Sequence, residues 1–129
     1  MPYLYLNAAA LDQSELVGSH HCVALIQRYT NAPNTGAWHE GAAVRGNLSL
    51  VQGTAIATFV NGRYPNLSHG NHAAFYLSQD GGGIWVIDQW KGDPNKSRVT
   101  KRYIPFRGHW QDGTFANPSN NGDAFHVIE

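Results

Sequence analysis

The chain has little cysteine, no excess charge of either sign and no long apolar run. Cys22 is the single cysteine among 129 residues, so an internal disulfide is impossible and the fold does not depend on an oxidising compartment. Nine Lys and Arg residues balance nine Asp and Glu residues. This balance leaves no overall positive field to attract nucleic acid or an anionic membrane, and we expect neither as a partner.

The N-terminus also lacks the features of a secretory leader. Met1–Asn7 has no basic start and no long apolar core, and no stretch approaches the length of a membrane-spanning helix. These absences predict a protein synthesised in the cytoplasm without a signal peptide and without membrane insertion. If it acts elsewhere, a dedicated machine must carry it there.

The residues that are present suit a single domain over 1–129. Apolar residues make up 42% of the chain, and 14 glycines favour tight turns. We expect helices over 6–17 and 21–29 and a loop over 35–41. Apolar runs bounded by turn residues predict strands over 50–60, 72–79, 84–90, 99–106 and 124–128. Helices followed by a mostly antiparallel sheet indicate an α+β fold.

The cysteine stands where a loop is expected to run into the second helix. Cys22 would lie in the first helical turn, where unpaired backbone N–H groups lower the pKa of a thiol. Its own backbone N–H would be a natural donor to a developing oxyanion, although the sequence does not identify a second donor. A lone cysteine is more often a small buried apolar residue, so its position alone does not decide for catalysis.

A histidine and an acid can be placed together on the next two expected strands. The turn signal Gln79–Gly83 predicts a hairpin. If the turn centres on Asp80, His72 lies opposite Asp88 on the same face. A register shifted by one residue would bring Gln89 to that face instead. We favour Asp88, because a carboxylate stabilises an imidazolium whereas an amide only orients the ring.

Cysteine, histidine and acid in this chain order are the parts of a thiol hydrolase. Cys22 would attack a carbonyl as thiolate, His72 would move the proton, and Asp88 would hold the ring. Such a site needs no cofactor. No metal is expected either, because the seven histidines show no ligand set at a recognisable spacing.

Three further residues are candidates for binding substrate. Trp90 shares the face of Asp88 by alternation and could form a wall of the site. Tyr64 lies in a turn before the histidine strand and could overhang the cleft. His21 directly precedes the cysteine.

Three segments of the chain resemble the NlpC-type and CHAP superfamily of cysteine amidases and peptidases. The segments are Gly18–Arg28, Gly53–Phe59 and Gly70–Tyr76. The resemblance covers roughly residues 18–90 and implies a papain-like fold with Cys22, His72 and Asp88 as the catalytic residues. One departure is His20-His21, where members more often have Asp, Asn, Gln or small residues.

The resemblance also implies a substrate. Such enzymes usually cleave amide bonds in peptidoglycan stem peptides. A small catalytic domain with no signal peptide and no wall-binding module is similar to the amidase effectors of type VI secretion systems. Those effectors are delivered into rival bacteria and are restrained in the producer by an immunity protein. The implied partners are peptidoglycan stem peptides and a possible immunity protein, and the implied destination is the periplasm of a target bacterium.

Two other functions stay open on the sequence alone. The domain could keep this fold and use its groove for recognition without catalysis, or it could hydrolyse a different amide or ester. Reactivity of the thiol would separate catalysis from binding, and digestion of cell walls would separate the substrates. The sequence specifies neither the bond that is cut nor an oligomeric state.

Overall fold

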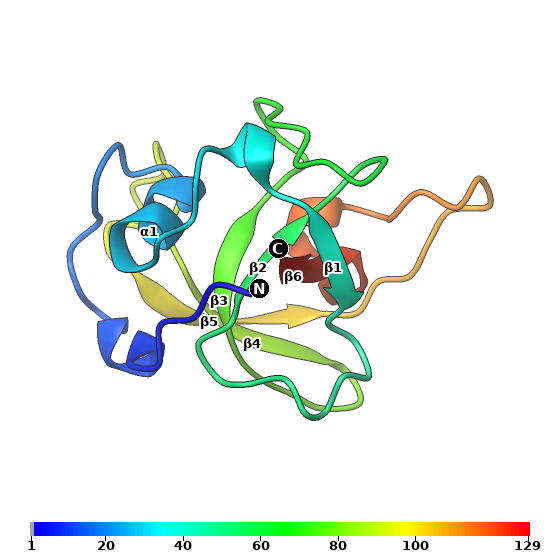
Figure 1. Cartoon of the computed structure of the whole chain (residues 1–129), viewed down its shortest axis with the longest axis horizontal. Coiled ribbons are helices and arrows are strands. Elements are labelled where there is room, and N and C mark those ends of the chain that lie inside the picture. The colour runs from blue at the N-terminus through cyan, green and yellow to red at the C-terminus, as the bar shows by residue number, and fades with distance from the viewer. Residues whose placement is uncertain (1) are drawn as a thin grey trace.

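Six antiparallel strands form one curved sheet in the computed structural model, which describes residues 2–129 (Figure 1). Their order across the sheet is β1-β6-β2-β3-β4-β5. The strands are β1 Glu40–Ala43, β2 Ala55–Thr58, β3 Ala73–Gln79, β4 Gly83–Asp88, β5 Thr100–Pro105 and β6 Phe125–Ile128. One α-helix, α1 (Cys22–Tyr29), lies against β3. Short 3-10 turns occur at η1 Ala8–Leu11, η2 Thr35–Ala37, η3 Pro118–Asn120 and η4 Gly122–Ala124.

Two apolar clusters, one on each face of the sheet, form the core. Successive side chains of a strand point to opposite faces, and β2, β3, β4 and β6 each contribute to both clusters. The first cluster joins the sheet to α1 and includes Leu25, Ile26, Ala55, Phe75 and Ile87. The second includes Val44, Ile56, Tyr76, Val86, Ile104 and Phe125. Because Ile104 belongs to one edge strand and Val44 directly follows the other, the sheet must curve around this second cluster.

The helix α1 agrees with the prediction to within one residue. Leu25 and Ile26 are fully buried, as expected for the apolar side of a surface helix. The helix ends at Tyr29 and is capped by Thr30, whose backbone N–H and hydroxyl both donate to the carbonyl of Ile26. At the other end, His21 has an extended backbone, which leaves Cys22 as the first helical residue.

The helix predicted over residues 6–17 is wrong. Only η1 forms there, and Gln13 adopts a left-handed φ of 72°. The N–H of Gln13 donates to the carbonyl of Val99, and the N–H of Val99 donates to the carbonyl of Ser14. Pairing with a segment distant in the sequence therefore replaces the local hydrogen bonds that a helix would have made.

The strand predictions are largely confirmed, but β1 was not predicted and most of the observed strands are shorter than expected. Four of the five strands begin and end within two residues of their expected limits. The strand expected over 50–60 shrinks to β2, because the N–H of Thr54 turns back to the carbonyl of Val51. The loop expected over 35–41 includes the start of β1, a largely exposed edge strand whose residues show no apolar alternation.

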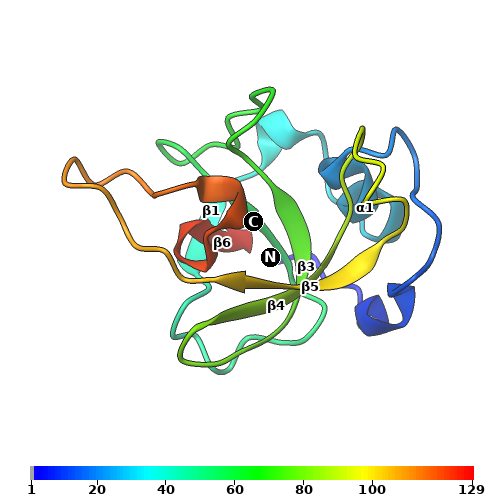
Figure 2. The same ribbon diagram turned by 180° about the vertical axis from the view of Figure 1, so that it is seen from behind.

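The connection between β4 and β5 lies beside α1 in both views (Figures 1 and 2). It brings residues that follow β4 close to the loop that precedes α1. The chain therefore places the N-terminus of α1, the start of β3 and the end of β4 at one end of the sheet. These three points carry the cysteine, the histidine and the acid.

Candidate active site

The structure brings Cys22, His72 and Asp88 together. Nε2 of His72 lies 2.8 Å from Oδ2 of Asp88, which leaves the other ring nitrogen, Nδ1, for the thiol. His72 is buried and Asp88 is completely so, whereas Cys22 is partly exposed. Together they form a chain of interactions that starts at the surface, at the sulfur, and ends inside the protein.

A bulge in β3 sets the register between β3 and β4. Next to the turn Gln79 pairs with Ile84, whereas further along Phe75 pairs with Ile87. The extra residue is Leu77, since two steps along β3 match only one step along β4 at that point. The sum of paired residue numbers thus falls by one across the bulge.

This bulge decides which side chain faces His72. Continued past the bulge, the register sets Ala74 opposite Asp88 and makes His72 its diagonal neighbour, within reach of long side chains. The direct opposition predicted from the sequence is therefore wrong by two residues, although the face is right. Without the bulge, Gln89 would share the face of His72.

Gln89 instead holds the loop that carries the cysteine. Its Oε1 accepts the N–H of Val17 at 2.9 Å. Its Nε2 donates to the carbonyls of Val17 at 3.1 Å and His21 at 2.8 Å. Because Gln89 is completely buried and bridges both ends of the segment before Cys22, it fixes the helix N-terminus against β4. Sequence reasoning weighed Gln89 only as a partner for His72.

Two basic residues that the sequence analysis did not select complete the surroundings of Asp88. Nζ of Lys96 lies 2.8 Å from Oδ1, and Nη2 of Arg102 lies 2.8 Å from Oδ2. Alternation offered one signal, since Arg102 pairs with Val86 and so shares the face of Asp88. Burial acts to raise the pKa of Asp88, but the hydrogen bond from His72 and the charges of Arg102 and Lys96 hold that pKa well below its ordinary value.

The electrostatics favour an ion pair between cysteine and histidine. Burial acts to lower the pKa of His72, but its hydrogen bonds with Asp88 and Cys22 and their charges raise it to about 9. Burial acts to raise the pKa of Cys22, but the hydrogen bond and charge of His72, with smaller contributions from Tyr64 and the Ala73 backbone, bring it below its ordinary value. Around neutral pH these shifts favour thiolate beside imidazolium.

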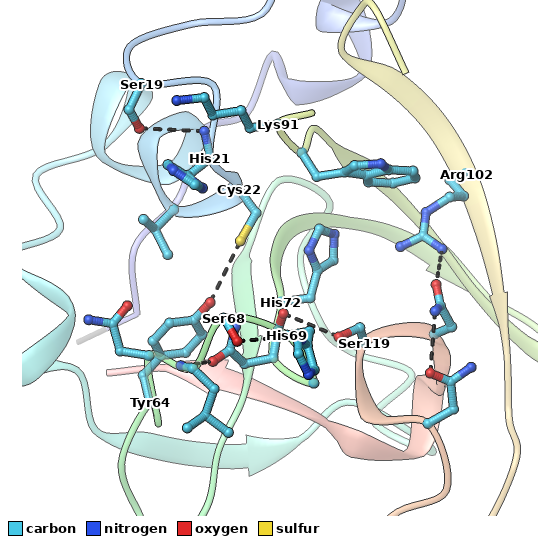
Figure 3. Close-up of a pocket in the computed structure, with 18 residues that line it drawn as sticks. Ser19, His21, Cys22, Tyr64, Ser68, His69, His72, Lys91, Arg102 and Ser119 are labelled. Carbon is cyan, nitrogen blue, oxygen red and sulfur yellow. Dashed lines mark hydrogen bonds between the residues drawn. The ribbon is translucent and has the colours of Figure 1, made fainter. Parts of the chain in front are cut away.

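The three predicted substrate-binding residues all line one cleft of about 860 Å³ that opens over Cys22 and His72. Figure 3 shows His21 beside the cysteine on one side and Tyr64 on the other. Tyr64 lies closer to the thiol of Cys22 than predicted, since its hydroxyl is 3.6 Å from Sγ. Trp90 stacks beneath two cations, with Nζ of Lys96 4.4 Å and Cζ of Arg102 4.9 Å from the ring centroid.

Within residues 2–129, no group of three or more His, Cys, Asp or Glu side chains is arranged to hold a metal ion. The same part of the chain has no helix that combines the length and the apolar character needed to cross a membrane.

The family model described as Domesticated amidase effector 2 matches residues 7–128. The chain belongs to this family. A "Type VI secretion amidase effector 2 protein" of Salmonella typhi is 55% identical, and the similarity covers all of both chains. The "Domesticated amidase effector 2" of Ixodes scapularis is 36% identical over 88% of this chain and 73% of the tick protein.

A solved structure supports the assignment to the domesticated amidase effector 2 family. The structure of a "Type 6 secretion amidase effector 2" superposes with a TM-score of 0.92, at 53% identity, and covers 98% of this chain and 94% of that one. The match confirms the predicted α+β fold of the papain-like amidase type. It also confirms the predicted resemblance to small amidase effectors of type VI secretion systems.

Proposed function

We propose that this chain is a cysteine amidase that hydrolyses an amide bond in the stem peptides or cross-links of bacterial peptidoglycan and acts as a secreted antibacterial effector. The observation that carries the proposal is the Cys22–His72–Asp88 arrangement at the floor of an open cleft, in a member of an amidase effector family. A domain that only bound ligands would have no need of a thiol whose pKa is lowered by a buried histidine and acid.

The reaction proceeds through a thioester. The thiolate of Cys22 attacks the carbonyl carbon of the scissile amide and forms a tetrahedral oxyanion. The imidazolium of His72 then donates its proton to the nitrogen, the C–N bond breaks and the amine leaves. His72, now neutral, takes a proton from water, and the hydroxide attacks the thioester. A carboxylic acid leaves, and proton and charge return to the Cys22–His72 pair.

Two donors stabilise the oxyanion in this scheme. The first is the backbone N–H of Cys22, which points out of the N-terminus of α1. The second is the hydroxyl of Tyr64, which is 3.6 Å from the attacking sulfur. Burial, together with the charge and hydrogen bond of Cys22, raises the pKa of Tyr64, so the hydroxyl keeps its proton and stays a donor.

The partners follow from the same proposal. The stem peptide occupies the cleft between His21, Tyr64 and Trp90, and a cognate immunity protein protects the producing cell by covering this opening. The site of action is the periplasm of the target bacterium, where peptidoglycan is accessible.

Digestion of purified Gram-negative peptidoglycan tests the proposal. Wild type and Cys22→Ala are incubated with the polymer, and the muropeptides are separated by liquid chromatography and identified by mass spectrometry. We expect cleaved stem or cross-link peptides with wild type only, and each hydrolysed bond should yield one new amine terminus and one new carboxylate. Unchanged muropeptides from a folded wild type would reject the cell-wall substrate, and cleavage by Cys22→Ala would reject the thiol mechanism.

A further inference from the structure

The cleft over Cys22 is lined by several basic side chains and no acidic one. Among residues 2–129, eighteen line it, and none of these is Asp or Glu. Lys91, Arg102 and the imidazoles of His21 and His69 are among them. Figure 3 shows Lys91 beside His21 on one side of Cys22, and Arg102 on the far side of the cleft. A cleft that is lined by positive charges and has low-dielectric walls concentrates its electric field on a bound anion.

The surroundings of Asp88 explain why this positive charge faces the cleft. One buried carboxylate contacts two permanent cations, Lys96 and Arg102, in addition to His72. Lys96 is itself buried, with 5% of its side chain exposed, and does not line the cleft, so it can balance Asp88 alone. Arg102 is then the surplus cation. Its side chain is 21% exposed and reaches the cleft.

Arg102 is held in place before any ligand arrives. Nε and Nη2 contact Asp88, and Nη1 donates to Oδ1 of Asn120 at 2.9 Å. Its guanidinium also lies against the ring of Trp90. A fixed, planar guanidinium with protons still available on its terminal nitrogens is suited to binding a carboxylate through charge-assisted hydrogen bonds. Because the group is already ordered, binding costs little side-chain entropy.

We propose that Arg102, assisted by Lys91, binds a free carboxylate of the substrate, so that the enzyme selects amides with an unmodified carboxylate near the scissile bond. This inference rests on the proposed function, because it names what that same cleft recognises. The substrate class is an acidic peptide. Amidation of its carboxylates makes it a poor ligand.

Binding of paired muropeptides tests the inference without turnover. Cross-linked muropeptides from Gram-negative peptidoglycan are used with carboxylates intact or converted to methylamides, and their dissociation constants for Cys22→Ala are measured by calorimetry. We expect the methylamides to bind roughly 10- to 100-fold more weakly, as for loss of a charge-assisted hydrogen bond. Adding Arg102→Gln should reduce this preference to less than about threefold, and adding Lys91→Met should reduce it in part.

Lys101→Met is the matched control. It removes the same charge from β5, but Lys101 lies over Trp85 and does not line the cleft, so the preference should be unchanged. Equal binding of the two muropeptides, or full preference in folded Arg102→Gln, would overturn the inference. If Arg102→Gln does not fold, Lys91→Met is the deciding variant, because it leaves every contact of Asp88 in place. An unchanged preference for the free carboxylate in Lys91→Met would also overturn the inference.

The two proposals fail separately. Turnover of both muropeptides by wild type at equal kcat/KM would leave the amidase standing and remove the carboxylate selection. A binding preference without any cleavage by wild type would keep the selection and remove the amidase.

Discussion

Asp88 and Gln89 are neighbours in the sequence and hold the two halves of the candidate site. Asp88 contacts His72, and Gln89 ties down the loop before Cys22. Alternating side chains at the end of one strand therefore position both His72 and the segment before Cys22. The two residues do not compete for one role, because each has its own partner.

Replacing Gln89 with Ala is expected to lower both stability and thiol reactivity. Three partly buried hydrogen bonds are lost, and each orphaned backbone group costs up to about 1–3 kcal/mol, less where water reaches it. The loop can then move Cys22 away from His72. Urea unfolding measures the first effect, and iodoacetamide alkylation measures the second.

Gln79→Ala is the matched control for this prediction. Gln79 also bonds three backbone groups of a loop, those of Val44, Gly46 and Asn47, but at the other end of β3. It should lower stability and leave alkylation of Cys22 unchanged. Equal reactivity in the two variants would mean that Gln89 does not position the cysteine.

The positions of single site residues were predictable where a local sequence pattern marks the start or end of a helix or strand. Cys22 at a helix start, His72 at a strand start and Asp88 at a strand end are local signals, and the structure places all three together. Lys96 and Arg102 were not found as partners of Asp88. The contact of Lys96 depends on how the β4–β5 connection folds back, which no period-two or helical pattern encodes, and that of Arg102 depends on the register between β4 and β5.

At the level of elements, the hairpin shows how one inserted residue determines which side chain of β4 faces His72. The turn signal was sufficient to predict that β3 and β4 pair, but the bulge at Leu77 had no mark in the sequence. Strands with strong apolar alternation were predicted well. The edge strand β1 and the extended segment around Gln13 were not, because pairing with distant segments stabilises them.

The N-terminal segment packs on β2 so closely that Gly53 is required there. Its φ is +97°, and a Cβ would lie 2.1 Å from the carbonyl oxygen of Tyr5. The backbone N–H of Tyr5 also donates to the carbonyl of Gly53. Gly53→Ala must therefore displace the first segment. We expect a loss of more than about 2 kcal/mol in unfolding free energy, from the positive φ and the clash together.

Gly46→Ala separates these two contributions. Gly46 has a φ of +81°, and no atom lies within 4 Å of the point that a Cβ would occupy, so only the backbone penalty of about 1 kcal/mol applies. Urea unfolding of both variants gives the comparison. Equal losses would show that the contact with Tyr5 is not a constraint.

On the scale of the whole molecule, balanced composition conceals an uneven charge distribution. Lys and Arg equal Asp and Glu in number, yet the residues of 2–129 that line the cleft include no acid. Composition could predict the absence of a global field, and it could not predict a local one, because that depends on which side chains the fold turns toward the opening. The absence of a nucleic-acid partner stays a prediction.

Alkylation of Cys22 as a function of pH tests the central claim, a thiolate held by a protonated His72. A free thiol with a pKa near 8.5 is less than about 1% thiolate at pH 6. The lowered pKa of Cys22 predicts much faster alkylation at that pH, and the pKa of about 9 for His72 keeps its proton in place well above neutrality.

Wild type and His72→Ala are compared with iodoacetamide from pH 5 to 9, with the modified peptide identified by mass spectrometry. We predict rapid alkylation of wild type at pH 6 and loss of the excess in His72→Ala. In that variant burial still raises the pKa of the thiol, and only the smaller contributions of Tyr64 and the Ala73 backbone lower it, so the thiol keeps its proton to higher pH. Wild-type alkylation at pH 6 no faster than that of a free thiol, or an unchanged rate in His72→Ala, would contradict the account.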